Sequence, residues 1–126
     1  MTQMHRHKLI AMEDATEALL TFFPNLREAY ARATGAGQGE IAGPYIVYED
    51  VFFPYITTLL ASTDTDARQG ALDFVDLLVT SDDARVHDLV RVVILAPLTI
   101  DPSQLAEARR HLGPATKRTL RQLKHA

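Results

Sequence analysis

Residues 67–94 read ARQGALDFVDLLVTSDDARVHDLVRVVI, and the spacing of the apolar residues in this stretch decides the fold class. Apolar residues recur at intervals of three or four on both sides of a polar Ser-Asp-Asp break, which is typical of two consecutive amphipathic helices. Ser81 is suited to cap the second helix, and Asp82 and Asp83 would lie in its first turn, where the helix dipole favours anions. The expected buried residues are Ala67, Ala71, Phe74, Val75 and Leu78 in the first helix and Val86, Leu89, Val90, Val93 and Ile94 in the second.

The preceding segment, 44–62, carries two conflicting signals. Residues 45–48 (YIVY) have high strand propensity, but an apolar residue recurs at every fourth position from Val47 to Leu59, which is helical spacing. We favour a helix over this segment. Pro54 would remove the hydrogen bond to the carbonyl four residues earlier, so a kink or a helix start is expected there.

The other segments also have helical patterns, and glycines concentrate in a flexible loop over 35–43. Because the links are short, consecutive helices should pack antiparallel. The predicted fold class is all-α: one domain over 1–126, a compact bundle of six to seven short antiparallel helices, resembling a short alpha-solenoid if the hairpins stack. The further helices are predicted over 8–23, from an Asn25 cap to Gly35, from Asp101–Pro102 to Leu112 and after Pro114, and Pro97 is expected to end the helix that Ser81 caps.

The composition places the chain among ordinary globular proteins. It has 126 residues, of which 47% are hydrophobic and 23% charged, enough apolar residues for one core. The absence of cysteine excludes disulfides, thiolate nucleophiles and thiolate zinc sites. No apolar run reaches the length of a membrane span, and acidic residues follow the basic N-terminus too soon for a secretion signal. We therefore expect a cytoplasmic protein without a membrane partner.

The charge is distributed unevenly along the chain. Residues 1–106 carry 7 Lys/Arg against 15 Asp/Glu, whereas residues 107–126 carry 6 Lys/Arg against Glu107 alone. An acidic body attracts cationic partners and repels nucleic acid. The C-terminal basic cluster has no accompanying aromatic residue, which argues against a nucleic-acid partner and favours contacts with the acidic body or an acidic partner. Its members are Arg109, Arg110, Lys117, Arg118, Arg121 and Lys124.

Asp83 and His87 are spaced i, i+4 and could share a metal ion, with Asp73, Asp76 or Glu49 as further ligands. A carboxylate in a first helical turn is expected from the helix dipole alone, however, and no His-x-x-x-His or Glu-x-x-His pair is present. We therefore predict no metal site.

Signals of catalysis are equally weak. None of the serines lies in a Gly-x-Ser-x-Gly elbow, and the glycine-rich run at 35–39 lacks the Lys-Ser/Thr of a phosphate-binding loop. We predict no catalytic residue, no cofactor and no enzymatic activity. A non-catalytic domain that binds a protein partner is the expected class.

The best candidate for a binding surface is the aromatic group at 45–55, which holds five of the nine aromatic residues. Most of these rings should enter the core, but a helix in so small a domain cannot bury every face, so some should stay near the surface beside acidic residues. Charge reversal of the acidic residues together is expected to weaken partner capture without unfolding the domain. The predicted partner-binding residues are Tyr48, Glu49, Asp50, Phe53, Asp73 and Asp76.

Four motifs carry a resemblance to known proteins: YEDVF at 48–52, ALDFVD at 71–76, SDD at 81–83 and HLGPATK at 111–117. Over roughly residues 44–124 the chain resembles small helical bacterial proteins of unknown function that are similar to immunity proteins of polymorphic toxin systems. The resemblance implies an acidic helical protein that neutralises a basic toxin domain, often a nuclease, by covering its substrate groove. The alternative is a helical scaffold or homodimer that self-associates through the aromatic segment.

Overall fold

The computed structural model describes residues 10–33 and 43–124, and over these ranges the chain forms seven helices and no strand. This confirms the predicted all-α bundle. Most of the predicted glycine loop, the Gly35 helix end and the start of the helix predicted over 8–23 lie outside the described residues. The seven helices are α1 (Ala15–Phe22), α2 (Arg27–Ala33), a helix over 44–60, α5 (Thr65–Val79), a helix over 84–98, α8 (Pro102–Arg109) and α9 (Pro114–Lys124).

Two of these helices contain a π-helical segment just before a proline. Helix 44–60 consists of α3 (Pro44–Val47), the π segment Tyr48–Phe52 and α4 (Phe53–Leu60). Helix 84–98 consists of α6 (Ala84–Leu89), the π segment Val90–Leu95 and α7 (Ala96–Leu98). In each, the N–H of the residue before the proline, Phe53 or Ala96, bonds to the carbonyl five residues earlier.

The π segments explain how both prolines remain inside helices. A proline has no N–H, and its ring presses on the carbonyl four residues earlier, so a wider turn relieves the contact. The irregularity predicted at Pro54 is therefore a π segment within a continuous helix, and the choice of helix over strand for residues 45–48 is confirmed. Pro97 was predicted to end its helix, and the helix ends one residue later, at Leu98.

Some predicted helix boundaries also need correction. Asn25 does not cap α2: it lies in a 3₁₀ turn, Pro24–Leu26, that leads into the helix. The Asp101 side chain caps α8 as predicted, accepting hydrogen bonds from the N–H groups of Ser103 and Gln104, but α8 ends at Arg109 rather than near Leu112.

Ser81 does not cap helix 84–98 as predicted; Asp83 does, accepting from the Arg85 N–H. The Ser81 hydroxyl is buried and donates to the Ile10 carbonyl at 2.6 Å, while the Met12 N–H donates to Asp83 at 2.9 Å. The Ser-Asp-Asp break therefore holds the start of the described chain against the bundle, an interaction that local spacing could not reveal.

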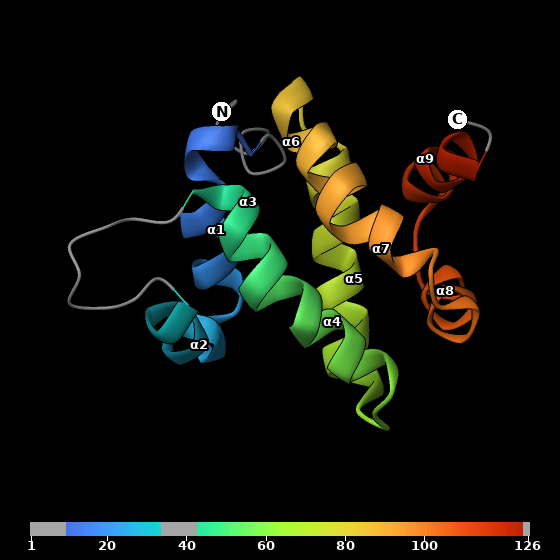
Figure 1. Cartoon of the computed structure of the whole chain (residues 1–126), viewed down its shortest axis with the longest axis horizontal. Helices are drawn as coiled ribbons and strands as arrows, with labels where there is room; N and C mark the ends of the chain where they lie inside the picture. The colour runs from blue at the N-terminus through green and yellow to red at the C-terminus, as the bar shows by residue number, and fades with distance from the viewer. Residues whose placement is uncertain (1–9, 34–42, 125–126) are drawn as a thin grey trace, which may run out of the picture.

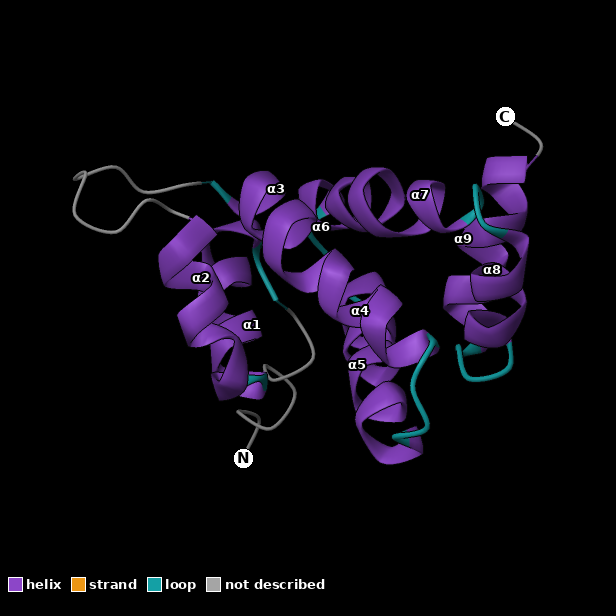
Figure 2. Ribbon diagram, turned by 60° about the horizontal axis from the view of Figure 1, so that its bottom comes forward, coloured by secondary structure: helices purple, strands orange, loops and turns teal. Residues whose placement is uncertain are grey.

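The helices pack around α5, which contacts α4, α6 and α9. Helix 44–60 and α5 form an antiparallel hairpin, helix 84–98 returns beside them, and the α1–α2 and α8–α9 pairs lie at opposite ends (Figures 1 and 2). Of the residues predicted to be buried in 67–94, all but the half-exposed Ala67 are buried. In the described chain, buried side chains form one core cluster that runs from Ile10 to Leu120.

Aromatic rings form the centre of this core, as predicted for most of the 45–55 group. Phe52 packs edge-on against Tyr48 and Phe74, with ring centroids 5.6 Å apart in both pairs, and all three side chains are fully buried. The Tyr48 hydroxyl donates to the Ala15 carbonyl at 2.7 Å. This satisfies the one polar atom of the ring and attaches α1 to helix 44–60.

Candidate partner-binding groove

A solvent-open groove lies between helix 44–60 and helix 84–98, where their two π segments meet. Its volume is about 280 Å³. Single-turn π segments inside α-helices occur frequently at functional sites, because they change the direction of the side chains that follow. The groove is lined by Tyr45, Glu49 and Phe53 from the first helix and by Val92, Val93 and Pro97 from the second.

One end of the groove is held by a polar link between the helices. The Tyr45 hydroxyl donates a short hydrogen bond, 2.5 Å, to the Asp88 carboxylate, which also pairs with Arg91 at 2.8 Å. The hydrogen bond from Tyr45, followed by that from Arg91, lowers the pKa of Asp88, and the same bond to Asp88 raises the pKa of Tyr45. Tyr45 is thus a hydrogen-bond donor that fixes the spacing of the two helices.

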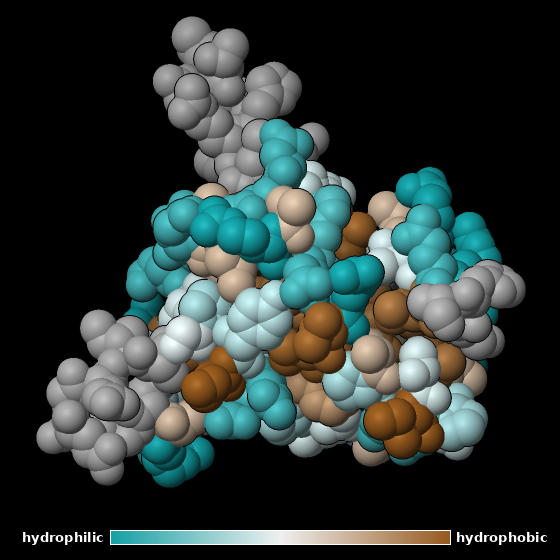
Figure 3. Space-filling model, turned by 45° about the horizontal axis from the view of Figure 1, so that its top comes forward, coloured by the Kyte–Doolittle hydropathy of each residue, from teal (hydrophilic) through white to brown (hydrophobic). Residues whose placement is uncertain are grey.

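The apolar part of the groove is open to solvent. Val92 is 52% exposed, Phe53 is half-buried, and Val93 lies beneath them with only 6% of its surface exposed. On the face that Figure 3 shows, hydrophobic residues form separate small patches among hydrophilic ones. Single exposed apolar residues are ordinary, but an exposed apolar residue that lines a concavity is typical of a ligand or protein contact.

The rim of the groove carries uncompensated negative charge. Glu49 and Asp50 are both exposed, and neither has a hydrogen bond or ion pair to another side chain in the described part of the chain. Arg91, the nearest cation in the sequence to the groove-lining valines, is already paired with Asp88. The local field at the groove is therefore negative, which favours cationic partners.

The structure separates the six predicted partner-binding residues into different environments. Glu49 and Phe53 line the groove, and Asp50, which follows Glu49 in the sequence, is exposed but is not a lining residue. The prediction that Tyr48 contacts a partner is wrong, because its side chain has no exposed surface and its hydroxyl donates to the Ala15 carbonyl. Asp73 is exposed on another helix, α5, where it accepts a hydrogen bond from Gln69 at 2.8 Å.

Asp76, the sixth predicted residue, serves the fold. Its two carboxylate oxygens each lie 3.0 Å from the Gly113 N–H, and Thr116 donates to it at 2.5 Å. Asp76 of α5 therefore caps the N-terminus of α9 across the core. A Cβ on Gly113 would come within 3.1 Å of Asp76, which explains the Gly-Pro start of α9. Two motifs of the resemblance, ALDFVD and HLGPATK, are thus partners in one contact.

Four groove residues were missed in the sequence: Tyr45, Val92, Val93 and Pro97. Tyr45 belonged to the aromatic group already singled out, and Val93 was assigned to the core, where it does lie. Val92 had a recognisable signal, because it is a large apolar residue outside the buried stripe of its own helix. Pro97 was predicted only as a helix end, and its place in the groove depends on how the two helices pack.

The other candidate sites have partners within the protein. Asp83 caps its helix and pairs with Arg85 at 2.7 Å, and these contacts, led by the Arg85 hydrogen bond, hold the pKa of Asp83 well below its ordinary value. The His87 Nε2 atom lies 2.6 Å from the Ser81 carbonyl. Over residues 10–33 and 43–124, no group of three or more His, Asp or Glu side chains could hold a metal ion.

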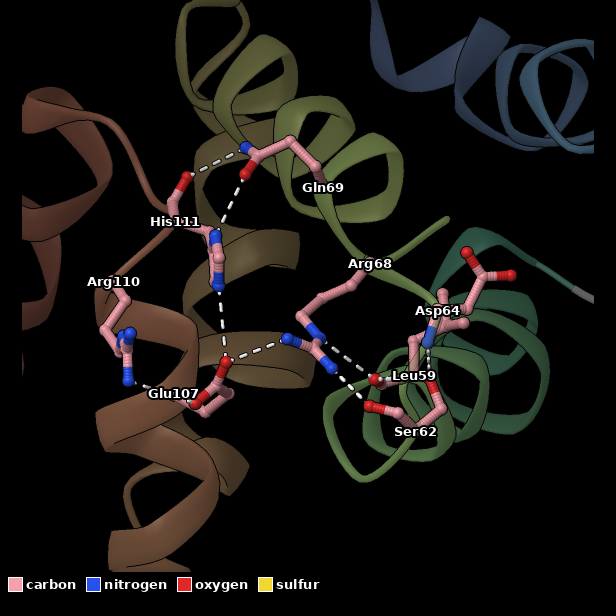
Figure 4. Close-up of polar contacts among 8 residues, drawn as sticks. All are labelled: Leu59, Ser62, Asp64, Arg68, Gln69, Glu107, Arg110 and His111. Atoms are coloured by element: carbon pink, nitrogen blue, oxygen red, sulfur yellow. Dashed lines mark hydrogen bonds and ion pairs between the residues drawn. The ribbon is translucent and has the colours of Figure 1, made fainter. Parts of the chain in front are cut away.

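A polar network joins the end of α4 to α5 and α8 (Figure 4). The buried Arg68 of α5 donates to the carbonyls of Leu59 and Ser62, at the end of α4, and to the Glu107 carboxylate of α8 at 2.9 Å. Glu107 also lies 3.3 Å from His111, whose Nδ1 atom is 3.0 Å from Gln69. All these groups bind each other, which is typical of a structural connection between helices.

The basic residues near the C-terminus have different environments. Arg110 pairs with Glu107 at 3.9 Å, while Arg118 and Arg121 are exposed on α9 without an ion pair in the described chain. No aromatic ring lies on α9 to stack on a base. The only ion pair shown for Arg110 is thus with Glu107 of its own segment, and the predicted contact with the acidic body of residues 1–106 is not seen for Arg110, Arg118 or Arg121 in the described chain.

The fold and groove define a class: an all-helical domain with a small apolar, acid-rimmed groove. Residues 16–125 match the family described as a domain of unknown function, DUF7674, and the chain belongs to this family. No curated protein and no solved structure matches the chain. Among the described helices, none is both long and apolar enough to cross a membrane.

Proposed function

We propose that this chain is a non-catalytic protein-binding domain that uses the groove between helix 44–60 and helix 84–98. The observation that carries the proposal is the position of the half-exposed Val92 in a concavity rimmed by Glu49. Protein interfaces place an apolar anchor at their centre and polar groups at their rim, and this groove has the same arrangement at small scale.

The side chains of the groove suit binding better than catalysis. A general base needs a pKa near neutrality and access to a substrate proton. The pKa of Tyr45 is raised, and its hydroxyl already donates to Asp88. Glu49 has no histidine, serine or lysine beside it among the lining residues.

We further propose that the partner is a toxin domain, so that the chain acts as an immunity-type protein. Support comes from the resemblance of residues 44–124 and from the acidic balance of residues 1–106. An acidic surface would meet the basic substrate groove of a nuclease and speed their association. A cytoplasmic location belongs to the same proposal, and fractionation of the native host would check it.

The test uses a pair of matched variants. Val92→Glu places a charge in the groove, and Ile100→Glu makes the same change at the 82% exposed Ile100, outside the groove lining. Both should fold, because both side chains already reach solvent. The first step is to look for a toxin gene beside this one, as the proposal predicts; in co-expression with that toxin domain, the wild type and Ile100→Glu should restore growth and Val92→Glu should not. Equal protection by both variants would refute the groove as the binding site.

A second candidate, self-association, is favoured by one observation. Ile100 is the most exposed large hydrophobic residue of the described chain, at the turn between α7 and α8. If copies of the chain pair through it, light scattering should show a dimer that Ile100→Glu converts to a monomer. A monomer in the wild type would remove this alternative.

A further inference from the structure

The size of the groove restricts what can occupy it. Small-molecule sites usually measure roughly 300–1,000 Å³ and enclose most of their ligand. This groove is about 280 Å³ and open to solvent. An apolar cavity of about 150 Å³ already holds a benzene molecule. The groove therefore has room for one or two large side chains, which a protein segment would insert from outside.

The charges beside the groove restrict the occupant further. Asp88 is satisfied by Tyr45 and Arg91, whereas Glu49 and Asp50 have no cation in the described chain. A segment with an acidic residue next to its apolar anchor would face like charges, and like-charge juxtaposition is strongly unfavourable. A segment with a lysine or arginine in the same place would supply the missing partners.

Of the four exposed large hydrophobic residues in the described chain, only Val92 has a lysine or arginine within four positions, and that residue, Arg91, is already paired with Asp88. The most exposed apolar residue, Ile100, is followed by Asp101, which would face Glu49. The basic helix α9 exposes Arg118 and Arg121, but its Leu120 is buried. Self-association through the groove would thus lack either an unpaired cation or an exposed anchor.

We infer that the groove binds a segment of another protein in which a large apolar side chain lies within one helical turn of a lysine or arginine. The apolar side chain contacts Phe53, Val92 and Val93, and the cation lies over Glu49 and Asp50. This inference rests on the proposed protein-binding function and adds the chemistry of the partner.

The experiment selects binders from a displayed library of random dodecapeptides on the wild-type chain, with counter-selection on Val92→Glu. Enriched peptides should pair Leu, Ile, Met or Phe with nearby Lys or Arg. Charge reversal at both acids, Glu49→Lys with Asp50→Lys, should weaken these peptides by roughly tenfold or more, about the effect expected when two attractive pairs become repulsive. Asp73→Lys, the same change on α5, should leave their binding unchanged.

The outcomes separate this inference from the proposed function. Peptides that depend on Val92 but are acidic or uncharged would overturn the basic-apolar partner and leave the groove as a binding site. Peptides whose affinity is unchanged by the double charge reversal would likewise overturn the basic-apolar partner and leave the groove as a binding site. A selection in which no peptide distinguishes the wild type from Val92→Glu would overturn both.

Discussion

Replacing Asp76 by alanine should destabilise the domain although the residue was predicted to face a partner. The carboxylate accepts from the Gly113 N–H and the Thr116 hydroxyl, and Thr116 has no exposed surface. Hydrogen bonds to a charged group contribute about 1.5–3 kcal/mol, and a buried donor left unpaired costs about 1–3 kcal/mol. Part of the carboxylate is solvated, so we expect Asp76→Ala to lose about 2–4 kcal/mol.

The assay is urea unfolding at neutral pH followed by circular dichroism, comparing transition midpoints at equal slope. Asp73→Ala is the matched control, because Asp73 is exposed one turn earlier on α5 and should change stability by only about 0.5 kcal/mol. Asp76→Ala and Thr116→Ala should be clearly non-additive when combined, since both remove the same contact. A loss no larger than that of Asp73→Ala would refute the capping role.

This role also changes the design of charge-reversal experiments on partner capture. A lysine at position 76 would put a cation at the N-terminus of α9, where the helix dipole opposes it. Lost capture could then reflect a loosened α9. Reversal of Glu49, Asp50 and Asp73 alone avoids this, and it should weaken capture with an unchanged unfolding midpoint.

Three further predictions concern polar contacts within the fold. Arg68→Met should destabilise the domain by about 2–3 kcal/mol, measured by urea unfolding, because Glu107 and the carbonyls of Leu59 and Ser62 each lose a hydrogen bond from a buried charged group; an unchanged midpoint would show that the network contributes nothing. Tyr48→Phe should cost about 1 kcal/mol in the same assay, since the Ala15 carbonyl loses the hydrogen bond from the buried Tyr48 hydroxyl, and a stabilised variant would contradict this. The pKa of Asp83 is lowered in the folded state, so its contribution to the free energy of unfolding is complete above the ordinary aspartate pKa of about 3.9 and is lost as the pH falls toward the folded value. Asp83→Asn should therefore reduce the acid-side pH dependence of the unfolding free energy. An unaltered pH dependence would contradict the lowered pKa.

The sequence by itself determined the fold class and most of the core. Helix formation depends on residues three and four positions apart, so the apolar stripes of 67–94 and the spacing from Val47 to Leu59 were sufficient to predict helices and their buried faces. The Asp101–Pro102 start of α8 was likewise local, because a cap involves only the first turn.

Only the tertiary structure decided what each polar residue contacts. Asp73 and Asp76 look alike in the sequence, yet one is exposed and the other caps a helix 37 residues away. The groove has the same origin, because Glu49 and Val92 come together only when two separate helices pack with their π segments in contact. Hydrophobic periodicity reports which face of a helix is buried but not which neighbour covers it, and for that reason the site required the structure.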